Sequence, residues 1–301
     1  MAIVFVFTVW NGGAGHDARP DPRHWPTVLP TTPETYLGVY RTGVPGSYTG
    51  ISAFTDQTGV RPQLVVYYSG WFEPFKARFA VTAADHGAVP LVQINPTGIK
   101  LAAITSGKYN RYLRAYAKAV RAYRGPVILS FGHEMNTNWY SWGYQHTSPA
   151  VFVAAWRHIV TLFRRLDVRN VTWLWTANVI QRDSRIARPN PWWPGQNYVT
   201  WVGLDGYYDS PSWKFASLFG PTIVDVRGFT HDPILITETS AAPSADQPAK
   251  IADVFAGVRL YGLLGLIWFD SAHKQDWRLA SSAAIAAFHE GAMSYRGLSH
   301  Q

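Results

Sequence analysis

The 301-residue sequence predicts a single (β/α)8 barrel, and three observations lead to this fold class. Eight short runs rich in Val, Ile, Leu, Tyr and Trp recur along the chain, with helical stretches between them. The runs are almost continuously apolar, as expected of parallel strands that are covered on both faces. Their average spacing of about 30 residues suits a barrel, which usually takes about 250 residues.

The expected strands follow one another from residue 36 to residue 269. They are Tyr36–Tyr40, Leu64–Tyr68, Val89–Ile94, Val127–Phe131, Val171–Thr176, Val199–Asp205, Ile234–Thr237 and Leu264–Phe269. A doubly wound open sheet is the main alternative. It is disfavoured because the runs exceed the usual count of about six strands and because no Gly-x-Gly-x-x-Gly turn follows the first run.

Three of the intervening segments have clear helical periodicity. The clearest runs from Ser148 to Leu166, where Ser148 is the expected N-cap and Pro149 the first helical residue. Its apolar residues recur every three or four positions, which predicts a buried stripe of Phe152, Ala155, Trp156, Ile159, Val160 and Phe163. Helices are also expected over Tyr109–Tyr123, with a stripe of Tyr112, Tyr116, Ala119 and Tyr123, and over Ile251–Leu260.

The composition is that of a globular protein with an excess of aromatic rings. Hydrophobic residues make up 47% of the chain and charged residues 15%, which excludes a disordered chain. The 14 Trp, 16 Tyr and 15 Phe exceed what a core needs, so some rings are expected in a cleft that binds a flat, apolar-faced ligand. The net charge is +8, but the basic residues are scattered, so we expect no nucleic-acid partner. The absence of cysteine excludes disulfides and a thiol nucleophile.

The amino-terminal 35 residues are expected to precede the barrel, which then occupies residues 36–301. Residues 1–10 form an apolar run that is too short to span a bilayer. This run is either a residual signal peptide, although it has no basic n-region or cleavage site, or an apolar arm packed on the domain. Residues 11–35 are rich in Gly, Pro, Asp and Thr and predict a flexible lead-in.

Two glutamates stand at strand ends, where a barrel gathers its functional residues. The fourth expected strand ends Leu-Ser-Phe-Gly-His-Glu-Met-Asn, which places Glu134 at the rim, and the seventh ends Ile-Thr-Glu-Thr-Ser, which places Glu238 there. Either residue alone is more typical of a salt bridge or a loop cap. As a pair on strands that face each other across the mouth, they have the arrangement that cleavage of a glycosidic bond requires.

These segments resemble glycoside hydrolase family 26. The resemblance rests on Phe-Gly-His-Glu-Met-Asn followed by Trp139, Trp142 and Gly143, on Trp-Val-Gly-Leu-Asp-Gly-Tyr-Tyr, and on Thr-Glu-Thr-Ser, and it extends from about Tyr36 to Phe269. That family holds β-mannanases of the large (β/α)8 clan with glutamates on strands 4 and 7. One departure is visible, since Thr137 and Asn138 follow His-Glu-Met-Asn where family members often carry Gly.

The resemblance implies roles for individual residues. Glu134 would be the general acid/base and Glu238 the nucleophile of a retaining mechanism. His133 would support the acid/base, Trp139 would line the cleavage subsite, Tyr207 would hydrogen-bond the nucleophile, and Asp205 would help to shape the site. Apolar rings near Glu134 would favour its protonated form, and the Tyr207 hydroxyl would keep Glu238 ionised.

Several tryptophans lie near strand ends or in loops on the expected rim, where sugar stacking and simple packing are equally reasonable. They are Trp71, Trp139, Trp142, Trp192, Trp193 and Trp268. Trp268 resembles the strand 8 tryptophan that forms the floor of the cleavage subsite in related barrels. Trp173 and Trp175 share one face of the fifth strand, where packing is favoured.

The leading hypothesis is therefore a secreted, monomeric endo-β-1,4-mannanase without a cofactor, acting on mannan, glucomannan or galactomannan. The same mechanism on β-1,3-xylan or mixed-linkage β-glucan is the first alternative, because loops select the sugar. A non-catalytic carbohydrate-binding barrel is the second. A zinc protease is disfavoured because Thr137 replaces the second His of His-Glu-x-x-His. No membrane partner is expected.

Overall fold

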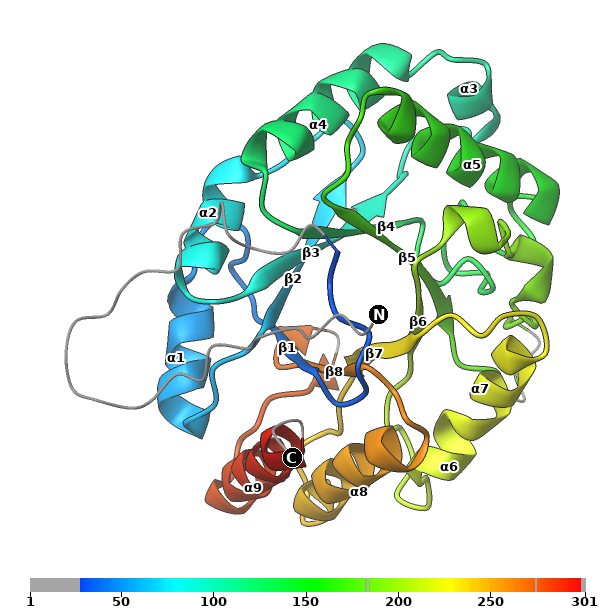
Figure 1. Ribbon diagram of the computed structural model, residues 1–301. Helices are drawn as coiled ribbons and strands as arrows, with labels where there is room; N and C mark the ends of the chain where they lie inside the picture. Colours follow the sequence, from blue (N-terminus) through cyan, green and yellow to red (C-terminus); the bar gives the residue numbers. More distant parts are fainter. Residues whose placement is uncertain (1–27, 182, 184, 274, 299–301) are drawn as a thin grey trace, which may run out of the picture.

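The computed structural model describes residues 28–298 apart from residues 182, 184 and 274. This part of the chain folds around a closed barrel of eight parallel strands in sequence order, with β8 pairing back onto β1 (Figure 1). The strands are β1 Tyr36–Tyr40, β2 Leu64–Gly70, β3 Val89–Asn95, β4 Val127–Phe131, β5 Val171–Asn178, β6 Trp201–Asp205, β7 Ile234–Thr239 and β8 Gly265–Phe269. The expected (β/α)8 barrel and its eight strands are confirmed, and the closed ring excludes the open sheet.

The helices form a layer outside the strands (Figure 1). They are α1 Thr49–Thr58, α2 Ala77–Asp85, α3 Ala102–Thr105, α4 Asn110–Tyr123, α5 Pro149–Arg165, α6 Phe215–Leu218, α7 Gly220–Arg227, α8 Gln247–Leu260 and α9 Ser282–Leu298, with the 3-10 helices η2 Asn190–Trp192 and η3 Gln196–Tyr198. Within the described range, no helix has the length and apolar character needed to cross a membrane.

The two best-defined helices test the periodicity argument differently. α5 begins at Pro149 after Ser148, and all six residues of its expected stripe are buried. α4 matches its expected range, but its buried residues are Leu113, Tyr116, Ala117 and Val120. Of the expected α4 stripe only Tyr116 is buried, because the other rings cover the edge of the contact and remain partly exposed.

The barrel interior is filled by its own apolar cluster, separate from the larger one between strands and helices. It contains Leu29, Tyr36, Leu64, Val66, Val89, Leu91, Ile128, Leu174, Trp201, Leu235, Leu264 and Ile267. Most of these residues lie in the first half of their strand, so the cluster closes the amino-terminal end of the barrel and leaves the chemistry to the other end.

Leu29 belongs to this interior cluster although it precedes the first strand, and the Tyr36 hydroxyl donates to the Pro30 carbonyl at 2.9 Å. Within the expected lead-in, Leu29 is thus packed at the base of the barrel, whereas residues 30–33 are exposed. Residues 1–27, including the expected apolar run, lie outside the described residues.

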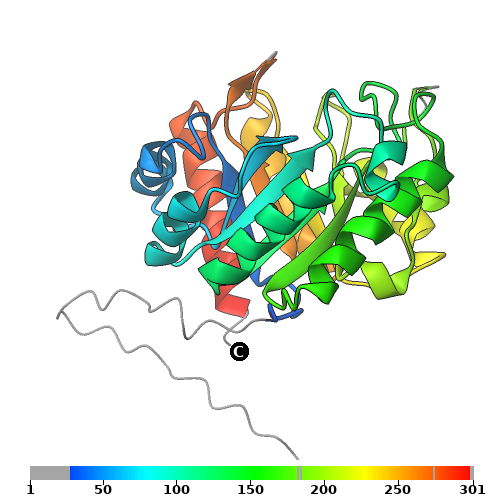
Figure 2. The ribbon, with the colours of Figure 1, turned by 90° about the horizontal axis from the view of Figure 1, so that it is seen from above.

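Towards the carboxyl ends of the strands the interior becomes polar. Ser130, Thr176 and Thr237 are fully buried there. Gly203 lies among them, and a Cβ at that position would come within 2.5 Å of the Thr176 hydroxyl oxygen. In the side view, the hairpin of β9 (Ala272–His273) and β10 (Gln275–Asp276) and the loop after β5 project from one end of the barrel (Figure 2). This end carries the candidate site.

Candidate active site

Glu134 lies in the loop that follows β4, in a conformation that glutamate seldom adopts. Its φ is +53°, in the left-handed region. The loop is held there by backbone contacts: the Glu134 amide donates to the Thr176 carbonyl of β5 at 2.9 Å, and the Thr137 hydroxyl donates to the Glu134 carbonyl at 2.8 Å. Such strain is maintained only where the surroundings fix it, and it is concentrated at functional sites.

Further along, the same loop folds tightly back on itself. A Cβ at Gly143 would lie 2.2 Å from the carbonyl oxygen of Thr137, so no other residue fits without displacing the backbone. Asn136 is fully buried and joins the loop to β5, because its amide group donates to the carbonyls of Asn178 and Ala187 and its oxygen accepts from the Asn178 amide. The position of Glu134 is therefore fixed from both sides of the loop.

Both oxygens of the Glu134 carboxylate accept hydrogen bonds from nitrogen donors. The Trp139 indole donates to Oε2 at 2.7 Å, and the Asn178 side-chain amide donates to Oε1 at 2.6 Å. Trp139 is 44% exposed, whereas Glu134 and Asn178 are buried. The buried carboxylate is therefore hydrogen-bonded to the edge of an indole ring that solvent can reach.

Glu238 lies on β7, and an irregularity in that strand directs its side chain into the barrel. Leu204 pairs with Ile236, but the next residue of β6, Asp205, pairs with Glu238, so β7 has one extra residue at this point. Thr237 and Glu238 both reach the interior as a result, since the Thr237 hydroxyl donates to Asp205 and the Glu238 carboxylate meets the barrel tyrosines. A regular strand would send successive side chains to opposite faces.

Two phenols hold the Glu238 carboxylate. The Tyr207 hydroxyl donates to Oε2 at 2.8 Å, and the Tyr68 hydroxyl of β2 donates to Oε1. Burial, followed by the charge of Glu238, raises the pKa of both phenols, so they remain protonated donors. The expected contact between Tyr207 and Glu238 is present in the structure.

Burial and the nearby carboxylate of Glu134 raise the pKa of Glu238 to about 7, against the hydrogen bonds from Tyr68 and Tyr207. Burial is also the main cause of a raised pKa at Asp205, with smaller effects from Glu238 and Glu134. Asp205 is fully buried, and one of its carboxyl oxygens accepts a hydrogen bond from the Thr237 hydroxyl. Two neighbouring carboxylates in a buried site do not both ionise readily. The pair of Glu134 and Glu238 is therefore expected to retain one proton into the neutral pH range.

His133 precedes Glu134 and is buried, and burial lowers the pKa of its imidazole to about 3. The neutral ring hydrogen-bonds Tyr140 through Nε2 at 3.2 Å, and its Nδ1 has no hydrogen-bond partner among the described residues. Its hydrogen bond therefore connects it to Tyr140, whose ring stacks on Trp142 at 4.3 Å. No three His, Asp or Glu side chains gather into a possible metal site in the part of the chain that the structure describes.

The sequence profile of glycosyl hydrolase family 26 matches residues 100–290, more than half of the chain, and the match includes both glutamates. The chain belongs to glycosyl hydrolase family 26. The expected resemblance and the expected class of enzyme, a glycoside hydrolase, are thereby confirmed.

Two curated proteins are similar in sequence to this family 26 chain, and their names refer to different substrates. Endoglucanase H of Acetivibrio thermocellus is 26% identical over 279 residues, covering 84% of this chain and 31% of that protein. Mannan endo-1,4-beta-mannosidase A and B of Caldalkalibacillus mannanilyticus is 31% identical over 86 residues, covering 26% of this chain and 16% of that protein. The chain thus spans a third or less of the length of the curated relatives that it matches.

Solved structures share the fold at low sequence identity. The GH26 beta-mannanase of Bacteroides ovatus has a TM-score of 0.66 and 14% identity, covering 88% of this chain and 90% of that chain. The mannanase man26 of Bacillus subtilis has a TM-score of 0.63 and 15% identity, covering 86% of both chains. These neighbours support the barrel of the family 26 chain at the level of the fold.

The structure assigns different positions to the six rim tryptophans expected from the sequence. Trp139 alone is both well exposed and bonded to a candidate catalytic carboxylate. Trp142 is buried beneath the site, where its indole donates to the His133 carbonyl at 2.9 Å. It supports the loop that carries Glu134 and does not offer a ring face to a sugar.

Trp268 does not form the floor of the cleavage subsite in this family 26 chain. It is fully buried between the barrel and α9, against Phe288 at 5.8 Å, because it faces outward from β8. The next residue, Phe269, faces the mouth, with its ring 4.5 Å from that of Tyr40 and 5.9 Å from that of Tyr207. The one-residue difference follows from the alternation of side chains along a strand.

The remaining three tryptophans are packing residues. Trp71 is buried among Tyr112 and Phe131 in the helix layer. Trp192 is also buried, and its carbonyl accepts the Trp175 indole. Trp193 is partly buried with its ring 5.2 Å from that of Trp175. Each of these three rings packs against other side chains of the large cluster between strands and helices, and none is seen to contact Glu134 or Glu238.

Sequence reasoning missed four residues that contact the site. Tyr68 and Asn178 end the apolar runs of β2 and β5 and hydrogen-bond Glu238 and Glu134, respectively. Phe269 and Trp277 flank Tyr207, with the Trp277 ring at 4.7 Å. The signal was present for Tyr68, which ends an expected strand, and for Asn178, which is a polar residue two positions after the expected fifth strand. Trp277 follows the β9–β10 hairpin, which no periodicity indicated.

Proposed function

We propose that the chain is a retaining glycoside hydrolase that cleaves β-1,4-mannosidic bonds in mannan-type polysaccharides. The observation that carries the proposal is the pair of buried carboxylates at the carboxyl ends of β4 and β7. Nitrogen donors hold Glu134, and two phenols hold Glu238. Membership of glycosyl hydrolase family 26 supports the reaction class. Two carboxylates that flank a glycosidic bond are sufficient to break it.

In the proposed mechanism, Glu238 attacks the anomeric carbon while Glu134 gives its proton to the glycosidic oxygen. The bond from the anomeric carbon to the leaving oxygen breaks, and a covalent ester between the sugar and Glu238 forms. Glu134, now anionic, then removes a proton from water as the water oxygen attacks the same carbon. The ester bond breaks, Glu238 is released as a carboxylate, and Glu134 is protonated again.

The environment of Glu238 supports its role as the nucleophile. One proton on the Glu134–Glu238 pair is the stoichiometry that the first step requires, and the raised pKa of Glu238 makes a doubly ionised pair unfavourable. The Tyr68 and Tyr207 hydroxyls stabilise the anion at Glu238 and so oppose the effect of burial on its pKa. The mechanism requires the single proton of the pair to be on Glu134 when the substrate is bound. Trp139 lies over Glu134 as an exposed ring on which a sugar can stack.

Two substrates have support. The match to a mannan endo-1,4-beta-mannosidase and the fold shared with mannanases favour mannan. The longer match, to a protein named endoglucanase H, favours a β-glucan as the second candidate, on the same two carboxylates. Loops around a common catalytic pair select the sugar, so both substrates are compatible with one mechanism.

The test is reducing-sugar release from glucomannan, galactomannan, mixed-linkage β-glucan and β-1,3-xylan by the wild type, Glu134→Ala and Glu238→Ala. The thermal transition of each variant verifies its folding. Activity of the wild type on mannans, lost in both folded variants, is the expected result. Cleavage of only a non-mannan polymer would contradict the proposed substrate and leave the proposed mechanism in place. Absence of cleavage of every polymer would favour a non-catalytic carbohydrate-binding barrel.

The stereochemistry is tested separately by proton NMR of the first product. Retention gives the β-anomer before mutarotation, and initial α-product would exclude Glu238 as the nucleophile. Azide distinguishes the roles of Glu134 and Glu238. As a small anionic nucleophile it can attack the sugar in place of water or in place of a carboxylate that has been removed. Glu134→Ala with azide is expected to yield the β-glycosyl azide, and Glu238→Ala the α-glycosyl azide.

Polymeric mannans and glucans are too large to enter cells, so the proposed place of action is outside the cell. Appearance of activity in the medium of the producing organism tests this. The proposed form is a monomer of 33.7 kDa, which light scattering on an eluting size-exclusion peak measures directly.

A further inference from the structure

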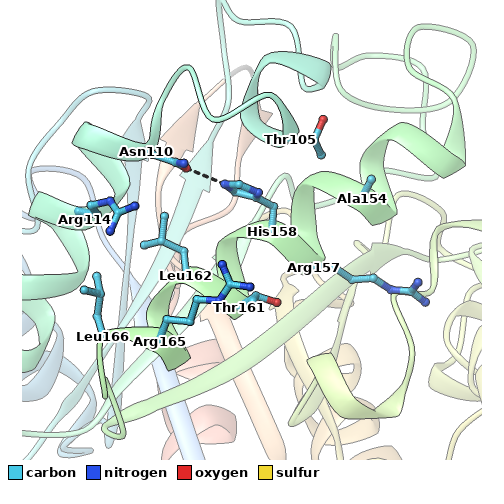
Figure 3. Close-up of a pocket in the computed structure, with 10 residues that line it drawn as sticks. All are labelled: Thr105, Asn110, Arg114, Ala154, Arg157, His158, Thr161, Leu162, Arg165 and Leu166. Atoms are coloured by element: carbon cyan, nitrogen blue, oxygen red, sulfur yellow. Dashed lines mark hydrogen bonds between the residues drawn. The ribbon is translucent and has the colours of Figure 1, made fainter.

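A pocket of about 380 Å³ lies in the outer layer of helices, between α3, α4 and α5 (Figure 3). It is separate from the candidate active site, because none of its lining residues contacts Glu134 or Glu238 in the structure. Its volume lies in the range of pockets that hold small molecules, which is roughly 300 to 1,000 Å³. The pocket is therefore larger than a single inorganic ion requires.

The lining of the pocket is positively charged. Arg114 of α4 and Arg157 and Arg165 of α5 contribute guanidinium groups, and no acidic side chain lines the pocket. Elsewhere on the described surface arginines are commonly paired with acids, as in Arg41, Arg121, Arg169, Arg185, Arg188, Arg259 and Arg278. Arg114 and Arg165 form no such ion pair among the described residues.

The three guanidinium groups differ in what they already bind. Arg157 points away from the pocket (Figure 3), where its Nε donates to the Pro194 carbonyl at 2.7 Å and its guanidinium lies 5.3 Å from the Tyr198 ring. Arg165 instead turns towards His158, and its charge adds to burial in lowering the pKa of that imidazole. Arg114 and Arg165 are therefore the two cations available to a ligand.

Neutral polar groups also line the pocket. His158 hydrogen-bonds the Asn110 side-chain oxygen at 2.6 Å, which fixes the imidazole across the gap between α4 and α5. The Thr161 hydroxyl is one turn from Arg165 on α5 and lines the same pocket. These groups offer hydrogen bonds to hydroxyls of the kind that a sugar carries.

We propose that this pocket binds a sugar-sized organic oxyanion, whose carboxylate or phosphate is held by Arg114 and Arg165 and whose hydroxyls meet His158 and Thr161. Guanidinium groups bind both oxyanions through paired N–H donors, and both are therefore candidates. A neutral glycan is disfavoured because no Trp, Tyr or Phe lines the pocket to stack on a sugar face.

The test is calorimetric titration of the full chain with glucuronic acid, glucose 6-phosphate, glucose and inorganic phosphate at low and at physiological ionic strength. The wild type is compared with Arg114→Gln/Arg165→Gln. Arg111→Gln/Lys118→Gln is the matched control, since it removes the same charge from exposed positions of α4 that do not line the pocket. Both double variants are expected to cleave soluble polymer as the wild type does, because the pocket lies outside the catalytic site.

The expected result is saturable binding of at least one of the two sugar acids, weakened about tenfold or more in Arg114→Gln/Arg165→Gln and unchanged in the control. The preferred acid identifies the anionic group. Equal weakening in the two double variants would show attraction by net charge alone and would overturn the proposal. Phosphate binding as tightly as glucose 6-phosphate would also overturn it, because the sugar would then contribute nothing, as would absence of binding by both sugar acids.

Discussion

The two candidate catalytic carboxylates accept side-chain hydrogen bonds from very different surroundings. Glu134 lies on a loop with a left-handed backbone and accepts from an indole and an amide, one of which is on the half-exposed Trp139. Glu238 lies within a strand and accepts from two partly buried phenols. Both carboxylates are themselves buried, so they differ in the backbone that carries them and in the donors that hold them.

The difference matches the two proposed tasks. An acid/base must exchange protons with a leaving group and then with water, so a donor on the half-exposed Trp139 suits Glu134. A nucleophile must remain fixed and ionised beside the anomeric carbon, so rigid strands and non-ionising phenol donors suit Glu238. Substitutions at Glu134, at Glu238 or at their hydrogen-bond donors should therefore affect the two tasks differently.

The largest effect is expected for the isosteric changes Glu238→Gln and Glu134→Gln. Glu238→Gln should lower kcat by about 10⁴-fold or more on every substrate, since the attacking oxygen is lost. Glu134→Gln should lower polymer cleavage by about 10² to 10⁴-fold but retain rapid release of dinitrophenol from an aryl glycoside, because that leaving group needs no proton. Burst kinetics with both substrate types measure this. Equal losses on the activated glycoside would contradict the division of roles.

The second prediction concerns stability and pH. Because the pKa of Glu238 is raised from 4.5 to about 7 in the folded state, its favourable contribution is complete below about pH 4.5 and is lost as pH rises through 7. The wild type should therefore lose about 3 kcal/mol relative to Glu238→Gln between pH 4.5 and pH 8. Urea unfolding at both values measures the difference. Glu290→Gln, at an exposed position of α9, controls for net charge and should not reproduce it.

The third prediction separates the two phenols from the rest of the site. Tyr68→Phe and Tyr207→Phe should each lower kcat/KM by about tenfold or more, since each removes a hydrogen bond to a charged group. The acidic limb of the pH profile should move to higher pH, because loss of a donor to the anion raises the pKa of Glu238 further. Tyr112→Phe, whose hydroxyl donates to the Glu73 carbonyl in the outer layer, should change neither quantity. An unmoved acidic limb in Tyr68→Phe would argue for a purely structural role.

The smallest effects distinguish two tryptophans. Trp139→Phe should lower kcat/KM a few-fold, about 1 kcal/mol or less, and leave the Tm unchanged, because water can replace a donor at a half-exposed position. Trp268→Phe should leave kcat/KM unchanged and lower the Tm by roughly several degrees, since it opens a cavity against α9. A Trp268→Phe variant with a normal Tm and a lowered kcat/KM would contradict the packing role and indicate that Trp268 contacts the sugar.

Most of the fold could be predicted because a parallel barrel strand is apolar on both faces. All eight expected runs became strands, although β6 begins at Trp201 and not at Val199. The buried face was harder to predict for helices whose surface carries both apolar and polar residues. In α4 the aromatic rings that define the expected stripe cover its edge, and smaller residues such as Ala117 make the closest contacts. Periodicity reports which face is apolar, but close packing selects small side chains at its centre.

The position of the candidate catalytic pair could be predicted for a different reason, since Glu134 and Glu238 follow apolar runs in segments that resemble those of a known family. The supporting residues could not be predicted equally well. A strand-end tryptophan such as Trp268 faces the mouth or the helices according to a one-residue register, which spacing alone does not determine. Tyr68 ends an apolar run that a buried tyrosine also fits, and its partner, Glu238, is 170 residues away in the chain.

The extra residue in β7 has a consequence for protein engineering. Because two successive side chains enter the barrel there, the direction of Glu238 is encoded in the backbone and not in the identity of the residue alone. A design that transplants Glu238 onto an ideal, evenly paired strand would place its carboxylate among the helices, as happens to Trp268 on the neighbouring strand. Grafting this site into another barrel therefore requires copying a strand irregularity together with the side chains, and alignments used for that purpose must allow a one-residue gap before Glu238.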